Sequence, residues 1–347
     1  MKNNSHHLEN IAYLSLQNPC NAKCPMCLSW RDGTVLGVDL IVELIEALAD
    51  DGWNTIIFTG GEFCTHPGFD RIVETIEKLD IKTGCITNGY SLFSTDAENF
   101  FERTKFSHLI YSRDFASSTE HSKFRKLPEW SDDMLAEKFS ALSAKKDVSI
   151  QINTVLTFQN YRTLSGFLEL PFWNHVNSWH IIPVKGPMAK RWSEEDIEHT
   201  KQVLRYVDGC CKEKGKAFFS PDIYGFTDLD LAEISNSRPT QAQVLGKKCL
   251  VQEHAIYLDA SGIILPCNSI DWASRATVGF GKLGEESAYG ILTKRRAMLA
   301  KEHNCERVGC QGCDPLNVQK NIALRSAGKE QVDGQNFLKN RSKASDA

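Results

Sequence analysis

The 347-residue sequence predicts an α/β protein built on a parallel sheet. Short apolar segments typical of buried strands alternate with segments whose apolar residues recur at helical spacing. Residues able to bind a ligand or a metal follow several of the strand segments. Because the carboxyl ends of parallel strands share one edge of a sheet, these residues are expected to form a single site.

The strand segments are expected at 11–17, 55–58, 81–87, 108–112, 148–156 and 178–184. Helices are expected from 38 to 49, from Pro67 to Leu79, and from about Tyr161. Proline is well tolerated in the first turn of a helix, which fits the start at Pro67. Six strands separated by helical segments favour right-handed crossovers in one sheet.

The strand–helix alternation stops after residue 184. A charged helix is expected over 194–214, a short strand over 217–220 and an irregular polar connector over 222–246. We expect four regions: a first domain over 1–190, a helical connector over 191–246, a small cysteine-rich domain over 247–320 and a polar tail over 321–347.

The composition excludes several partners. Forty basic and 44 acidic side chains give a net charge of −4, which offers no general attraction to nucleic acid or to anionic membranes. The polar N-terminus lacks the apolar stretch of a signal peptide, and no apolar run is long enough to span a bilayer. We therefore expect a cytoplasmic protein whose 12 cysteines are mostly metal ligands or core residues rather than disulfides.

Three cysteines, Cys20, Cys24 and Cys27, form a CxxxCxxC run directly after the first strand segment. Iron–sulfur clusters are commonly held by four thiolates, so a local set of three suggests a [4Fe–4S] cluster with one iron open to a substrate or cofactor. Taken alone, the run is also compatible with a zinc knuckle completed by a distant ligand, or with three core cysteines.

The second strand segment ends in Gly60-Gly61-Glu62. Two adjacent glycines let the backbone approach a ligand closely, and the carboxylate beside them can accept from an ammonium group. Together with the cysteine run, this stretch resembles the radical S-adenosylmethionine (SAM) enzymes. The resemblance implies a partial (β/α)₆ TIM-like barrel in which the cysteines bind the cluster, SAM occupies the open iron, and the Gly-Gly-Glu stretch lies along the methionine end of SAM.

The resemblance extends to two hydroxyl residues at later strand ends. Thr87 in a Thr-Asn-Gly turn and Ser112 in Tyr-Ser-Arg-Asp look like positions that bind the SAM carboxylate in relatives, although both also fit an ordinary turn and strand end. The chain departs from the family pattern in having Met26 where an aromatic residue usually flanks adenine, and Phe63 where proline usually follows Gly-Gly-Glu. Met26 can still supply a flexible apolar contact.

A second group of cysteines lies in the C-terminal part of the sequence. A predicted hairpin over 255–266 would bring Cys249 and Cys267 together, and Cys310 and Cys313 form a CxxC pair. This pattern resembles the twitch domain, a shortened SPASM extension that carries one auxiliary [4Fe–4S] cluster. A structural zinc site made of the same four thiolates is the alternative. Cys305 would replace one ligand, lie unligated, or donate a hydrogen atom to a substrate radical; Cys64 is a second candidate donor or a core residue.

The resemblance implies two [4Fe–4S] clusters, SAM and a one-electron donor such as flavodoxin or ferredoxin. One electron would cleave SAM to methionine and a 5′-deoxyadenosyl radical that abstracts a substrate hydrogen. The expected outcome is dehydrogenation of a small sugar-like or natural-product metabolite, with the auxiliary cluster as electron acceptor. The alternatives are crosslinking or epimerisation of a ribosomally made peptide, redox-neutral epimerisation or dehydration, and a non-catalytic iron–sulfur protein.

Overall fold

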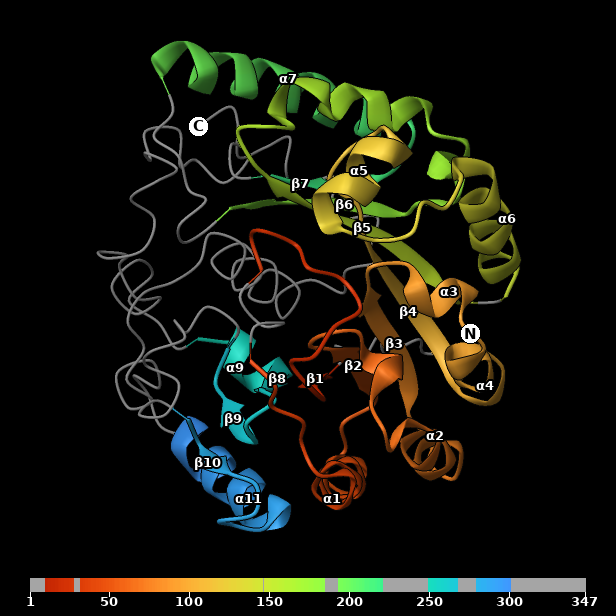
Figure 1. Ribbon diagram of the computed structural model, residues 1–347. Helices are drawn as coiled ribbons and strands as arrows, with labels where there is room; N and C mark the ends of the chain where they lie inside the picture. Colours follow the sequence, from red (N-terminus) through yellow and green to blue (C-terminus); the bar gives the residue numbers. More distant parts are fainter. Residues whose placement is uncertain are drawn as a thin grey trace, which may run out of the picture.

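The computed structural model describes residues 10–27, 32–145, 147–184, 193–220, 249–267 and 279–300. All the strands in these ranges belong to one curved sheet (Figure 1). The sheet has ten strands in the order β10-β9-β8-β1-β2-β3-β4-β5-β6-β7 and does not close into a barrel. The strands are β1 (Ile11–Ser15), β2 (Thr55–Thr59), β3 (Lys82–Thr87), β4 (Lys105–Ser112), β5 (Ser149–Leu156), β6 (Ser178–Pro183), β7 (Ala217–Phe219), β8 (Ala255–Leu258), β9 (Ile263–Leu265) and β10 (Gly281–Lys282).

Strands β1 to β7 are parallel to their neighbours, as the alternation of strands and helices predicts. The hairpin predicted near residues 255–266 is also present. Its first strand, β8, pairs in parallel with β1, so that Ala255 lies opposite Ile11, and β9 and β10 follow in antiparallel pairing. The hairpin therefore continues the sheet of the N-terminal part of the chain.

Helices line the outside of the curved sheet (Figure 1). The helices are α1 (Val38–Asp50), α2 (Phe69–Glu77), α3 (Tyr90–Phe93), α4 (Glu98–Arg103), α5 (Ser118–Arg125), α6 (Asp132–Ser143), α7 (Glu194–Glu213), α9 (Val251–His254) and α11 (Ala288–Leu299). Short 3₁₀ helices occur at Phe63–Thr65, Thr95–Ala97, Tyr161–Glu169 and Pro171–His175. Serine side chains cap several helix starts; Ser131, for example, accepts from the Met134 N–H at the start of α6.

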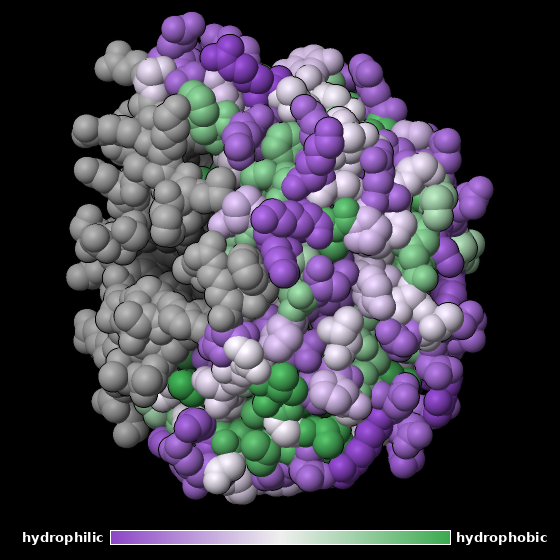
Figure 2. Space-filling model, viewed as in Figure 1, coloured by the Kyte–Doolittle hydropathy of each residue, from purple (hydrophilic) through white to green (hydrophobic). Residues whose placement is uncertain are grey.

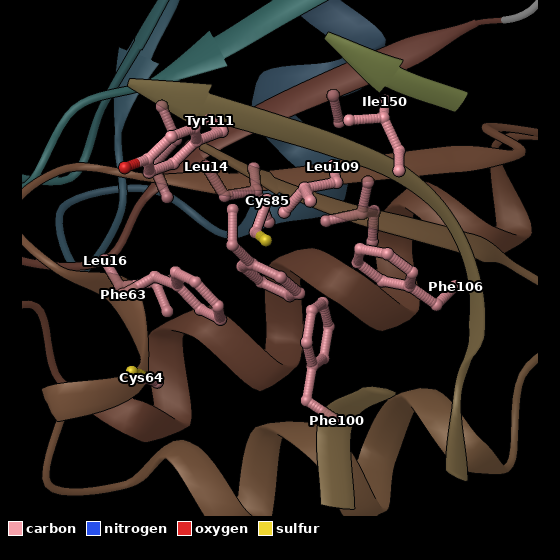
Figure 3. Packing of buried hydrophobic residues seen from close by; sticks show 14 of the residues in the cluster. Leu14, Leu16, Phe63, Cys64, Cys85, Phe100, Phe106, Leu109, Tyr111 and Ile150 are labelled. Atoms are coloured by element: carbon pink, nitrogen blue, oxygen red, sulfur yellow. The ribbon is translucent and has the colours of Figure 1, made fainter. Parts of the chain in front are cut away.

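The hydrophobic core fills the space between the sheet and these helices. Figure 3 shows Phe100 of α4 among apolar side chains from the strands, and its ring makes edge-on contacts with Phe58, Phe63 and Phe106. Cys64 and Cys85 belong to the same core. Because one face of each strand is packed in this way, the opposite, concave face is left for function.

The helix expected from about Tyr161 is a 3₁₀ helix instead. Pro171 allows no continuous helix into the next segment, since proline disfavours helical geometry in the residue before it, and 3₁₀ turns are common in such short connectors. Two helices between β4 and β5, α5 and α6, were not expected from the apolar spacing. The connector over 222–246 and the tail over 321–347 lie outside the described residues.

Hydrophilic side chains dominate the surface over α6 and α7 in Figure 2, in keeping with helices that bury one face against the sheet. Among the helices described here, none has an apolar stretch long enough to cross a membrane.

Candidate functional site

A cavity of about 250 Å³ lies at the carboxyl ends of strands β1 to β5. It collects residues from the loops after four strands, because parallel strands end at the same edge of the sheet. Eight of the residues singled out in the sequence line this cavity: Cys20, Cys24, Cys27, Met26, Gly60, Gly61, Thr87 and Ser112. Ala22, Thr59, Ile86, Asn88, Arg125 and Val155 complete the lining.

The three cysteines lie around one cavity. Cys20 Sγ accepts hydrogen bonds from the Ala22 backbone N–H at 3.4 Å and from Asn88 Nδ2 at 3.6 Å, and the Cys24 thiol donates to the Arg125 carbonyl at 3.9 Å. Burial raises the pKa of the Cys20 and Cys24 thiols to about 11, so these thiols must lose a proton when they bind a metal. Within the described residues, no three Cys, His, Asp or Glu side chains are grouped as ligands of a metal ion.

The glycine pair packs directly against the backbone that leads into the cysteine loop. The Gly61 N–H donates to the Gln17 carbonyl at 2.7 Å, and a Cβ atom at position 61 would overlap the carbonyl of Pro19. Gly60 has a φ of +113°, which L side chains rarely adopt. Both positions therefore require glycine, and the backbone at the cavity wall carries no side chain.

The Glu62 carboxylate is fully buried and faces the Thr87–Asn88 turn. Thr87 Oγ1 donates to Glu62 Oε1 at 2.5 Å and the Asn88 N–H donates to Oε2 at 3.1 Å. Burial raises the pKa of Glu62 to about 7, although both hydrogen bonds favour the carboxylate. In this arrangement Glu62 holds the turn after β3 in place, and it does not line the cavity.

Arg125, at the end of α5, brings a cation to the cavity. Its Nε donates to Asp114 Oδ2 at 2.7 Å, and its carbonyl accepts from the Lys23 N–H in the cysteine loop. Burial alone lowers the pKa of the guanidinium, but Asp114 and Cys24 outweigh it, so the net shift is upward. No sequence pattern indicates Arg125, because α5 has few apolar residues at helical spacing and no motif contains its last residue.

Cys64, a candidate hydrogen donor, lies in the hydrophobic core and does not line the cavity. Cys249 and Cys267 are both buried in small apolar clusters that share Ala255, the first residue of β8. The structure thus places these two cysteines at the same end of the hairpin, as the sequence predicts. Cys305, Cys310 and Cys313 lie outside the described residues.

The profile of the radical SAM superfamily matches residues 14–164, a stretch that contains all the cavity-lining residues named above. This part of the chain is therefore similar to the radical SAM enzymes. Over 96 residues it is 32% identical to the GTP 3′,8-cyclase of Psychromonas ingrahamii; the match covers 26% of this chain and 28% of that protein. The chain thus spans little more than a quarter of the length of this curated relative.

Two solved structures share the fold. SuiB of Streptococcus suis, bound to its precursor peptide SuiA, superposes with a TM-score of 0.59 at 15% identity, covering 82% of this chain and 64% of SuiB. The enzyme anSMEcpe with bound AdoMet and a Cp18Cys peptide superposes with a TM-score of 0.57 at 14% identity, covering 89% of this chain and 87% of that one. At these identities the likeness shows a common architecture.

Substituting Gly61→Ala should separate the glycine turn from the cysteine loop, because the new Cβ meets backbone atoms that cannot move independently. We expect the iron content after anaerobic reconstitution to fall at least about twofold, an estimate based on loss of a positioned ligand loop. Gly33→Ala is the matched control, since nothing lies within 4 Å of a Cβ there. Equal iron content in the two variants would contradict this account of the turn.

Glu62 predicts a pH-dependent stability. Its carboxyl pKa rises from 4.5 to about 7 on folding, so the folded chain keeps a proton that the unfolded chain loses. The stabilisation of the folded chain by this proton is fully present below pH 4.5 and is lost as the pH rises to about 7. Across this pH range the free energy of unfolding of the wild type should fall by about 3 kcal/mol relative to that of Glu62→Gln. Urea unfolding of both proteins at several pH values tests this; a stability difference independent of pH would refute it.

Proposed function

We propose that this protein binds a [4Fe–4S] cluster through Cys20, Cys24 and Cys27, binds SAM beside it, and uses the reductive cleavage of SAM to abstract a hydrogen atom from a substrate. The observation that carries this proposal is the single cavity that holds all three cysteines, the glycine turn and a buried cation. The similarity of residues 14–164 to the radical SAM superfamily supports both the cluster and SAM.

The residues present fit these groups. Thiolates are the usual ligands of iron–sulfur clusters, and three of them leave one iron for SAM. Reductive cleavage of SAM at such a centre supplies methionine and a 5′-deoxyadenosyl radical. The backbone of Gly60 and Gly61 offers close approach to the methionine end, Thr87 and Ser112 offer hydroxyl groups for its carboxylate, and Met26 offers an apolar contact for adenine. The Arg125 guanidinium compensates the negative charge of the thiolates or of the SAM carboxylate.

The concave face of the sheet next to this cavity carries a row of three polar side chains. Ser112 lies opposite Asn153 in the register of β4 and β5, and Asn153 lies opposite His180 in the register of β5 and β6. All three side chains are partly exposed and share one face, since partners in register point the same way. This row offers hydrogen-bonding partners to a substrate with hydroxyl groups, which favours a sugar-like metabolite.

An auxiliary [4Fe–4S] cluster bound by Cys249, Cys267, Cys310 and Cys313 completes the proposal. Cys249 and Cys267 both lie in clusters that include Ala255, and Ala255 pairs with Ile11 at the start of β1. The loop that carries Cys20 follows the other end of β1. Four residue steps of about 3.3 Å separate the two ends, or about 13 Å. A substrate on the concave face would lie between the two centres.

This arrangement supports dehydrogenation as the reaction. After hydrogen abstraction from a carbon bearing a hydroxyl, the substrate radical loses one proton and one electron to become a ketone, and the auxiliary cluster is the proposed acceptor of that electron. A small one-electron carrier such as flavodoxin or ferredoxin would reduce the first cluster, and we propose that the reaction takes place in the cytoplasm.

Peptide modification is the second candidate. It is favoured by the two structural neighbours above, one bound to a precursor peptide and one to a short peptide. The row of Ser112, Asn153 and His180 could also bind a peptide backbone, because amides and hydroxyls both donate and accept hydrogen bonds.

The triple substitution Cys20/Cys24/Cys27→Ala tests the SAM cluster. After anaerobic reconstitution with iron and sulfide, we expect it to lose one cluster by Mössbauer spectroscopy and at least about a hundredfold in dithionite-driven release of 5′-deoxyadenosine, because the open iron is lost. Cys210→Ala, in α7 and away from the cavity, is the control and should retain both properties. Full activity in the triple variant would exclude the proposed site.

The double substitution Cys249/Cys267→Ala tests the auxiliary cluster. The wild type should hold two clusters and this variant one, while release of 5′-deoxyadenosine without substrate persists, because the SAM cluster is untouched. The zinc alternative predicts a loss of zinc instead of iron, so both metals are measured in the same samples. An unchanged iron and zinc content would remove these two cysteines from any metal site.

A further inference from the structure

Asn88 is a buried cavity residue whose side chain is held in one orientation. It lies directly after Thr87 in the turn that follows β3, and 6% of it is exposed. Its backbone N–H donates to Glu62 Oε2 at 3.1 Å, and this hydrogen bond holds the turn in place. Its side-chain oxygen accepts from the Tyr90 N–H at 3.0 Å, at the start of α3.

This last contact determines which way the amide points. A backbone N–H can only donate, so the atom it meets must be the amide oxygen, and the NH₂ group must face the opposite side. There, Nδ2 donates to Asn21 Oδ1 at 2.9 Å and to Cys20 Sγ at 3.6 Å. Both amide hydrogens are thus directed at the cysteine loop, one of them at a sulfur.

The hydrogen bonds at Cys20 differ in what happens to them when iron binds. The Cys20 thiol itself donates to Asn21 Oδ1, and this bond is lost with the thiol proton. The donations from Ala22 N–H and from Asn88 Nδ2 need no thiol proton, so both can persist to a thiolate. Of these two donors, Asn88 comes from another strand end, 68 residues along the chain.

We propose that Asn88 is a positioning residue that raises the reduction potential of the cluster bound at Cys20, by donating an N–H···S hydrogen bond to that sulfur. The proposal rests on the function proposed above. Reduction adds one electron from an external one-electron donor, and no covalent bond forms or breaks. Because the reduced cluster carries one more negative charge, a donor to its sulfur stabilises the reduced state more than the oxidised state.

Two substitutions remove the donor and leave the turn intact. In Asn88→Asp an oxygen replaces the NH₂ group, while the other oxygen still accepts from the Tyr90 N–H. In Asn88→Ser the side chain is uncharged and too short to reach the sulfur, and its hydroxyl can still accept from the N–H two residues on, as the Asn88 oxygen does from Tyr90. The Asp variant adds a negative charge; the Ser variant separates the loss of the hydrogen bond from that charge.

The measurement is an EPR-monitored redox titration without SAM, on the full chain carrying Cys249→Ala and Cys267→Ala so that one cluster contributes to the signal. We expect Asn88→Ser to lower the reduction equilibrium constant about tenfold, equivalent to a midpoint potential about 59 mV more negative, and Asn88→Asp to lower it further. Iron content should match that of the parent protein.

Asn54→Asp is the matched control, because Asn54 precedes β2 at the opposite end of the sheet and also accepts through its side-chain oxygen. Its potential should equal that of the parent. Parental potentials in both Asn88 variants, or the same shift in Asn54→Asp, would overturn the proposal, as would loss of the cluster from Asn88→Ser. A parent protein that assembles no cluster would instead refute the proposed function.

Discussion

The close approach of two backbone segments is the constraint on which the site depends. Residues 16–19, which lead into the cysteine loop, run against the end of β2 and the glycine turn: Leu16 donates to the Thr59 carbonyl, Gly61 donates to the Gln17 carbonyl, and the Gln17 side chain donates to the Glu62 carbonyl. These bonds leave no room for a side chain at position 61. The cysteine loop and the glycine turn therefore behave as one unit.

Buried polar groups extend this unit to the next strands. Glu62 connects the glycine turn to Thr87 and Asn88 after β3, and Asp114, after β4, binds both Arg125 and the Val155 N–H of β5. Burying such groups is costly unless each has a partner, so their pairing specifies one arrangement of the strand ends. Pre-organisation of the cavity comes from these side chains as much as from the sheet.

The alternation of strands and helices predicted the parallel sheet, because buried strands and amphipathic helices leave clear periodic patterns. Motif spacing also selected most of the residues that line the cavity. Arg125 and the sulfur contact of Asn88 could not be predicted, because both depend on how distant strand ends meet. The 3₁₀ geometry after Tyr161 was missed for a local reason, since apolar spacing alone does not distinguish three from 3.6 residues per turn. The motif predicts that Glu62 binds SAM, and in the structure its carboxylate accepts hydrogen bonds from Thr87 and Asn88.

The pairing of β8 with β1 has a consequence for how the chain folds. One edge of β1 is covered by β2 soon after synthesis, but the other edge must wait for residues 255–258, and His254 contacts Asn10 across a separation of 244 residues. Contacts this distant in sequence form slowly, and an unpaired strand edge is prone to aggregation in the meantime. Early insertion of a cluster into the Cys20 loop, directly after β1, would give the nascent N-terminal half an ordered structure before its last neighbour arrives.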